Sequence, residues 1–125
     1  DARRGNPAYR FAKQVSAGLD ILKKQGIDTI VLDIQYHPQF EALYRTDEYR
    51  HHLRWVTGKQ DLPLLQRYEM IEYWEESGRV DLDSSSADIQ KTSFDFIQDC
   101  LAFQIARMIV NGVRLVPQSG WAPAR

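Results

Sequence analysis

The segment TIVLDIQYH at residues 29–37 constrains the fold more than any other part of the chain. Its apolar run at residues 30–32 follows an amphipathic stretch and Gly26, and such a run is typical of a strand buried in a parallel sheet. The run ends in polar side chains, first Asp33 and then residues 35–37. In open α/β sheets, ligands bind at the carboxyl ends of the strands. The segment therefore predicts an α/β fold with a candidate site just after this strand.

Local signals predict helices and strands in alternating order. Asn6 and Pro7 predict a helix start, because an Asn side chain caps a helix N-terminus and proline fits the first turn. Residues 38–45 fit either a loop over a site or a short irregular helix. The other predicted elements are a first helix that ends at Gly26, a strand from Ile27 to Ile34, a helix from Thr46 to Gly58, a strand from Leu62 to Leu65 and a helix from Tyr68 to Gly78.

The closing helix has apolar side chains around nearly its whole girth. We predict that Thr92 or Ser93 caps it after a polar loop at residues 81–87, and that it ends near Asn111 and Gly112. A helix that is apolar all round is typical of burial, so we expect it to be the most buried helix. We expect one α/β domain over residues 1–125, with a folded core at 6–112 and a flexible tail at 113–125.

Composition excludes several classes of protein. The chain has 125 residues, of which 43% are hydrophobic and 26% charged, which is typical of one soluble domain. Its net charge is -1 and its basic residues are scattered among acids, so we expect no nucleic-acid partner. No apolar run approaches the roughly 20 residues of a membrane span. Cys100 is the single cysteine and leaves the compartment open, periplasmic or secreted if a leader has been removed.

Two strands form a small sheet whose edges need partners. Either further strands exist that the local signals do not reveal, or another polypeptide completes the sheet. We expect the edge beside residues 30–34 to pair with a second copy of this chain or with another polypeptide.

Three motifs resemble the back half of an SGNH (GDSL-type) hydrolase. They are LDIQYHP at residues 32–38, LPLLQRYEMIEYW at 62–74, and a DxxK before the closing helix, formed by Asp88 and Lys91. The resemblance covers roughly residues 8–112. It implies part of a flavodoxin-like, three-layer parallel sheet rich in helices, and a serine hydrolase that acts on an ester or an acetylated carbohydrate.

Carried over to this sequence, the resemblance assigns roles to three residues. Gln35 takes the place of the Asn that donates a hydrogen bond to the oxyanion, and Asp88 keeps the acid of the family's DxxH motif. Lys91 replaces the histidine base, and a lysine with a pKa of about 10.4 is protonated at neutral pH. The serine-bearing GDS motif does not occur in the chain. The resemblance therefore implies a fragment that is inactive alone and needs an N-terminal half or a second polypeptide.

Other polar side chains complete the predicted site. Tyr36, His37 and Lys91 are candidate binding residues, although a histidine before a proline is more often hydrogen-bonded in its own turn. Asp33 interrupts an apolar strand and should meet a donor such as Arg67 or loop amides, as a structural ion pair or as part of a pocket. The alternative function is a noncatalytic binding or scaffolding subunit with a degenerate pocket.

We expect no metal and no cofactor. Glu48 and His52 share one helix face, but a zinc site needs three or four ligands, and a solvated charged face is the commoner arrangement. The glycine-rich loops that hold nucleotide phosphates do not occur in the sequence.

Overall fold

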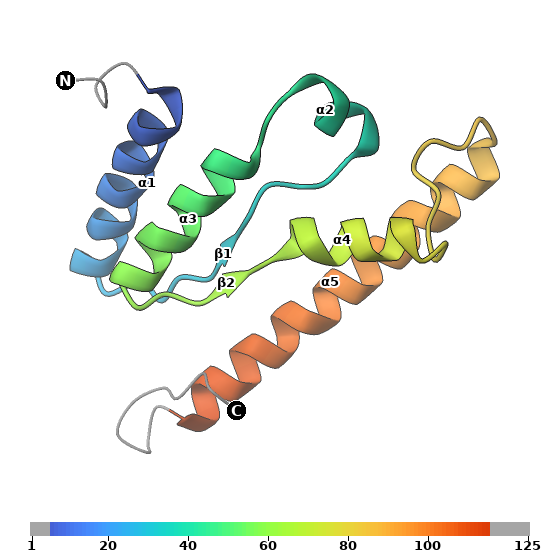
Figure 1. The fold of residues 1–125 in the computed structure, drawn as a ribbon. Helices are drawn as coiled ribbons and strands as arrows, with labels where there is room; N and C mark the ends of the chain where they lie inside the picture. The colour runs from blue at the N-terminus through green and yellow to red at the C-terminus, as the bar shows by residue number, and fades with distance from the viewer. Residues whose placement is uncertain (1–5, 116–125) are drawn as a thin grey trace. The chain divides into compact units, whose positions relative to one another are not determined.

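The computed structural model describes residues 6–115 of the chain (Figure 1). The chain divides into two compact units, residues 1–77 and residues 78–125, and each is described by itself. The predicted single domain over residues 1–125 stays a prediction. Of the predicted flexible tail, residues 113–115 are helical, and residues 116–125 lie outside the described residues.

Helix α1 spans Pro7–Lys24 and begins where the sequence predicts. The Asn6 side chain accepts hydrogen bonds from the backbone N–H groups of Ala8 and Tyr9, at 2.9 and 3.4 Å. These two donors would otherwise have no partner within the helix. After the helix, Gly26 adopts a φ of +71°, a left-handed conformation in which a side chain would be strained. The predicted start of α1 and the turn at Gly26 are confirmed.

The sheet of the first unit is small and parallel. Strand β1 is Val31–Leu32 and strand β2 is Leu64–Leu65, paired in the register Val31 with Leu64 and Leu32 with Leu65. A helix-rich chain with a parallel sheet fits the predicted α/β class. The predicted strands at 27–34 and 62–65 are too long, because a strand extends only where a neighbour accepts its hydrogen bonds. A three-layer, flavodoxin-like arrangement stays a prediction.

Helix α3, Asp47–Lys59, packs beside α1, and the two form the core of the unit (Figure 1). The buried side chains of Ala12, Leu19 and Val56 meet there. The amide of Gln60, just after α3, donates to the Ser16 carbonyl and hydroxyl oxygens at 3.2 and 2.9 Å. Val31 of β1 packs against this core, so the core positions the strand. The other partly buried side chains that pack against it are Val15, Leu22 and Leu62.

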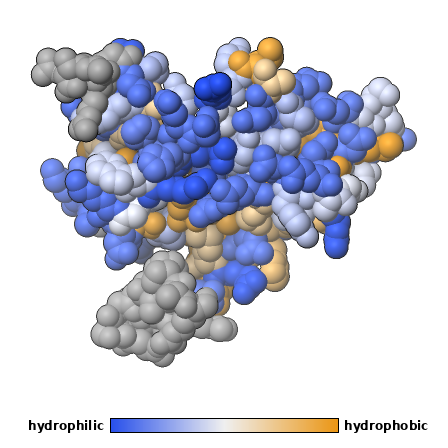
Figure 2. All heavy atoms as spheres, viewed as in Figure 1, coloured by the Kyte–Doolittle hydropathy of each residue, from blue (hydrophilic) through white to orange (hydrophobic). Residues whose placement is uncertain are grey.

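Helix α2, Pro38–Leu43, follows β1. Of the two alternatives predicted for this segment, a loop over a site and a short helix, the structure shows the short helix. It contributes no buried residue. Phe40, Leu43 and Tyr44 are exposed by 61%, 76% and 60%, and Figure 2 shows the apolar atoms that gather where α2 lies. Helix α4, Arg67–Glu76, follows β2 and ends before Gly78, whose φ is +79°.

The second unit consists of a loop and the long helix α5, Ala87–Leu115. The helix begins earlier than predicted, because the Ser86 hydroxyl accepts a hydrogen bond from the Ile89 N–H at 3.4 Å and caps it. Neither predicted cap has that role. The Thr92 hydroxyl donates to the Asp88 carbonyl within the helix, and the Ser93 hydroxyl accepts from the Asp81 N–H at 2.9 Å.

The prediction that the closing helix is the most buried is wrong. Among its described side chains, a single stripe of Ser93, Ile97 and Leu101 is buried, at i, i+4 and i+8. Phe103 is 60% exposed and Ile109 52% exposed. Apolar side chains around a helix bury only where a neighbouring element covers them, and the sequence of the helix does not specify that neighbour. None of the helices in the described part of the chain is long and apolar enough to cross a membrane.

Candidate functional site

The candidate site lies at the carboxyl ends of β1 and β2, in the first unit. Asp33 and residues 35–37 follow β1, and Arg67 and Tyr68 follow β2. Because the strands are parallel, both sets of side chains emerge at the same edge of the sheet. The structure therefore brings together four of the six predicted site residues, Asp33, Gln35, Tyr36 and His37.

Asp33 ties the end of β1 to the start of α4. Its Oδ1 accepts a hydrogen bond from the Tyr68 N–H at 2.9 Å, and its backbone carbonyl accepts one from Arg67 Nε. Gln66 occupies the N-cap position of α4 but makes no capping hydrogen bond with its side chain. The Asp33 carboxylate thus caps α4 from another segment, where the helix dipole favours a negative charge. The donor is a backbone amide, but it belongs to the first turn of α4 and not to a loop as predicted, and Arg67 contacts the carbonyl instead of the carboxylate.

Burial has the largest effect on the pKa of Asp33. The residue is 2% exposed, and its Oδ2 has no hydrogen-bond partner among the described residues. Burial raises the pKa of the Asp33 carboxyl above its ordinary 3.8, and outweighs the Tyr68 N–H and the charges of Arg67 and Arg50, which lower it.

We predict that Asp33 makes stability fall as the pH rises. Because the pKa of the folded carboxyl is raised, the folded state holds a proton that the unfolded chain has lost, and this favours folding below the folded-state pKa. The contribution is lost between the unfolded value near 3.8 and the raised folded value. Urea denaturation across that range measures the free energy of unfolding of wild type and of Asp33→Asn. We expect the value of the variant to increase relative to that of wild type as the pH rises. A constant difference between the two proteins would contradict the prediction.

Tyr68 lies beneath the strand ends and touches residues from several elements. Tyr68 is buried, with only 2% of its surface exposed. The guanidinium carbon of Arg50, in α3, lies 3.7 Å from the centroid of the Tyr68 ring, and the Tyr36 ring meets it edge-on at 5.1 Å. Cation–π and edge-to-face contacts each add to the stabilisation that burial of the ring supplies.

Gln35 and His37 differ in what their side chains do. Gln35 is exposed, and no side-chain hydrogen bond joins it to another described residue, so its amide is available to a ligand. His37 caps α2, because its Nδ1 accepts a hydrogen bond from the Gln39 N–H at 3.3 Å. This contact supports the structural interpretation of His37 and uses one of its two ring nitrogens.

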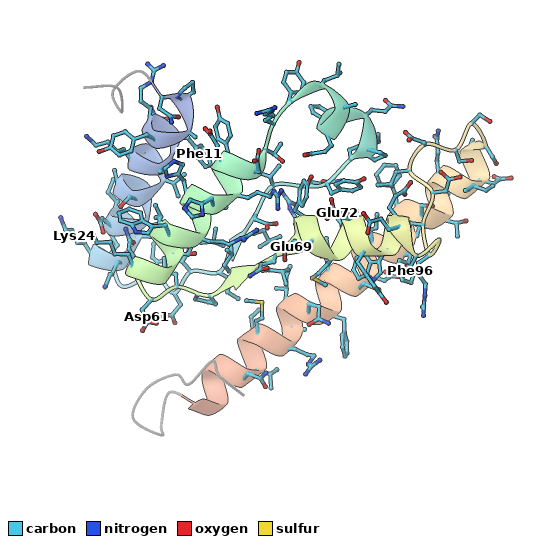
Figure 3. All side chains as sticks on the ribbon, viewed as in Figure 1. Phe11, Lys24, Asp61, Glu69, Glu72 and Phe96 are labelled. Atoms are coloured by element: carbon cyan, nitrogen blue, oxygen red, sulfur yellow. The ribbon has the colours of Figure 1, made fainter. Side chains whose placement is uncertain are left out.

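Acidic side chains surround the site. Burial raises the pKa of the half-buried Tyr36 phenol, and four carboxylates raise it further. They are those of Glu72, Glu75, Glu76 and Glu41. Glu69 and Glu72 both project from α4 (Figure 3), and Glu69 binds Arg54 at 2.7 Å. The Tyr36 hydroxyl therefore stays protonated at neutral pH and can donate a hydrogen bond.

Asp88 and Lys91 belong to the second unit. Asp88 is exposed in the first turn of α5. It therefore lies inside the helix, and not before it as predicted. Its negative charge stabilises the helix N-terminus, where the helix dipole is positive. Lys91 Nζ binds Asp95 Oδ2 at 2.7 Å, one helical turn along. The hydrogen bond that Lys91 donates to Asp95, followed by the charge of Asp95, raises the pKa of Lys91. Lys91 therefore stays protonated and does not serve as a general base.

A depression lies at the start of α3, away from the strand ends. It has a volume of about 510 Å³ and is lined by Asn6, Asp47, Glu48, His51 and His52. The described residues contain no group of three or more His, Cys, Asp or Glu side chains placed to hold a metal ion.

The sequence matches the Non-GDSL lipase-like family over residues 1–115. This chain belongs to the Non-GDSL lipase-like family. No curated protein and no solved structure matches it. Membership confirms the lipase-like, and hence hydrolase-like, relationship that the motifs LDIQYHP and LPLLQRYEMIEYW predict.

Sequence reasoning missed three residues around the candidate site. They are Glu41, Arg50 and Tyr68. For Tyr68 a signal existed, because it comes soon after the second predicted strand as residues 35–37 come after the first, and the strand-end rule applies to both. Arg50 lies in the middle of a helix, and only its contact with Tyr68 reveals its part in the site.

Proposed function

We propose that this chain supplies the C-terminal portion of an SGNH-type hydrolase that cleaves an ester or an acetylated carbohydrate. In this proposal an N-terminal half or a second polypeptide brings the nucleophilic serine. Membership of the Non-GDSL lipase-like family supports the hydrolase chemistry. The observation that carries the proposal is the exposed Gln35 amide just after β1, two residues beyond Asp33, which is held by three hydrogen bonds.

In the proposed reaction the serine hydroxyl attacks the ester carbonyl, and negative charge develops on the carbonyl oxygen. Gln35 donates a hydrogen bond to that oxygen. Such a donor lowers the barrier most when it is fixed before the reaction, about 2.7 to 3.1 Å from the developing charge. Asp33 supplies the fixed anchor two residues earlier, through Leu65, Arg67 and the Tyr68 N–H. Tyr36 and His37 line the pocket beside it.

The proton that leaves the serine needs a base. Lys91 is unsuited, because Asp95 holds it in the protonated form. The SGNH resemblance gives Asp88 the role of orienting a base and Lys91 a binding role, and both roles stay predictions. The free edge of β1 is the proposed docking place for the completing strand, since the described residues pair β1 with β2 alone.

A serine-reactive fluorophosphonate probe tests the proposal on the protein purified from its natural source. We expect the probe to label a serine in the natural assembly, on a longer chain or on a co-purifying polypeptide, and to abolish hydrolysis of acetyl esters. Native mass spectrometry of the same sample identifies the labelled species. An assembly that neither takes up the probe nor hydrolyses an acetyl ester would refute the proposal.

The second candidate function is a noncatalytic binding or scaffolding subunit. The specific observation in its favour is the Lys91–Asp95 pair, which occupies the position where the family's base would stand. If the natural protein is a lone 125-residue chain or its homodimer, the nucleophile has no source, and this candidate replaces the hydrolase.

A further inference from the structure

Three aromatic side chains lie along one face of α2. His37 is the N-cap of the helix, Phe40 lies in its first turn and Tyr44 is its C-cap. These positions are i, i+3 and i+7, which recur on one side of a helix. The ring centroids of His37 and Phe40 lie 6.4 Å apart, and those of Phe40 and Tyr44 lie 5.8 Å apart. We call these three residues the α2 strip.

The α2 strip is open to solvent. A stripe of this spacing usually packs into a core. Helix α2, however, contributes no buried residue, and Phe40 and Tyr44 are both exposed by about three fifths of their surface. The planes of these two rings meet at 34°, so the rings do not stack face to face and each keeps most of its surface open. Apolar side chains that are exposed together in this way mark a binding surface, whereas single ones do not.

The α2 strip continues the proposed hydrolase site. His37 is its first member, and His37 follows β1 two positions after the exposed Gln35 amide. The Nδ1 atom of His37 accepts a hydrogen bond from the Gln39 N–H at 3.3 Å, so Nε2 is the ring nitrogen that can bond a ligand hydroxyl. A molecule whose ester lies at Gln35 therefore has the rings of α2 beside it.

The chemistry of the α2 strip favours a sugar ring over a fatty acyl chain. The face of an aromatic ring is electrically negative and attracts the polarised C–H bonds on the face of a sugar ring. An open ring surface suits such a flat contact, whereas an acyl chain is bound in a cleft that encloses it. Helices that bind lipid surfaces are rich in Lys and Arg. Helix α2 contains Glu41 and no basic residue.

We propose that the α2 strip is a carbohydrate subsite, in which a sugar ring of the acetylated substrate packs against Phe40 and Tyr44 while its acetyl ester lies at Gln35. The inference rests on the proposed function for the ester and its position. It narrows the substrate from esters in general to acetylated carbohydrates. Sugar binding by the strip requires no catalysis, so binding and hydrolysis can be measured separately.

Saturation-transfer difference NMR on the full natural protein tests the binding. The probes are xylohexaose and chitohexaose, which carry no ester and are not consumed by an esterase. We expect irradiation of the aromatic protons of the protein to saturate the C–H protons of the sugar rings in at least one probe. Phe40→Ala should weaken binding of that probe about tenfold, because it removes a stacking surface. Phe40→Tyr keeps the ring and should retain binding.

Phe103→Ala provides the matched control. It removes the same kind of side chain from α5, where Phe103 is 60% exposed and Phe40 is 61% exposed, and it should leave sugar binding unchanged. The urea unfolding midpoint of Phe40→Ala should equal that of wild type, because the side chain is largely exposed. Absence of saturation transfer to both probes, or equal binding by wild type and Phe40→Ala, would overturn the inference. Binding to phosphatidylcholine vesicles that Phe40→Ala abolishes would also overturn it and would assign the strip to a lipid surface.

Hydrolysis tests whether the subsite serves the proposed reaction. Phe40→Ala should lower kcat/KM for acetylated xylo-oligosaccharides about tenfold more than kcat/KM for ethyl acetate, which has no sugar ring. The loss should appear mainly in KM, because the strip binds substrate and transition state alike. Equal losses on the two esters would overturn the role of the strip in the reaction. If wild type binds an oligosaccharide but hydrolyses neither ester, the proposed function fails and the carbohydrate subsite stands.

Discussion

Replacing Gln35 with alanine is expected to lower the kcat of the completed hydrolase about 100- to 1000-fold, the usual effect of removing one oxyanion donor. The side chain is exposed at the end of β1, so its loss should leave the free energy of unfolding nearly unchanged. KM should change little, because the hydrogen bond strengthens only as charge develops in the transition state. Steady-state kinetics on an acetyl ester, with a parallel urea denaturation, measures both quantities.

Two variants serve as controls for Gln35→Ala. Gln35→Asn keeps an amide donor and should retain much more activity than the alanine variant. Gln39→Ala removes an exposed amide from α2, four residues further along, and should leave kcat unchanged. If Gln35→Ala matches wild type in kcat, Gln35 is not the oxyanion donor, and the strand end loses its proposed catalytic role.

Replacing Leu19 with alanine is expected to lower the free energy of unfolding by about 2 to 5 kcal/mol. Leu19 is 8% exposed and belongs to the core in which α1 meets α3, with Ala12 and Val56. The substitution removes buried methyl groups and leaves a cavity, because the two helices are also held by the Gln60 contacts with Ser16 and cannot close the gap freely. Urea denaturation of both proteins measures the difference.

Ile21→Ala provides the matched control for Leu19→Ala. It removes a side chain of the same volume from the same helix, but Ile21 is 57% exposed. Its effect on the free energy of unfolding should stay within about 0.5 kcal/mol, apart from the small gain in helix propensity of alanine. Equal losses in the two variants would mean that the α1–α3 core does not determine the stability of this unit.

The sequence located much of the candidate site but not the contacts that organise it. The apolar run before Asp33, Gln35, Tyr36 and His37 was sufficient to place a strand end there, since the strand-end rule depends on order along the chain. The backbone donor for the Asp33 carboxylate was expected in kind, because a buried carboxylate requires one. That the donor is the Tyr68 N–H, 35 residues away, follows only from the pairing of β1 with β2.

The sequence alone determined the features whose interactions are local. Asn6 caps α1 because its side chain reaches the backbone N–H groups of Ala8 and Tyr9. Gly26 and Gly78 adopt positive φ angles, which suit glycine. Such interactions join residues a few positions apart, so the chain specifies them before it folds.

Only the tertiary structure decided the features that depend on a distant partner. The strands shorten to Val31–Leu32 and Leu64–Leu65 because a ladder exists only where both chains align. The Thr46 hydroxyl binds Glu41 instead of capping α3, and the Ser93 hydroxyl binds Asp81 instead of capping α5. A hydroxyl has several candidate partners of similar energy, and the packing of the chain determines which of them comes within reach.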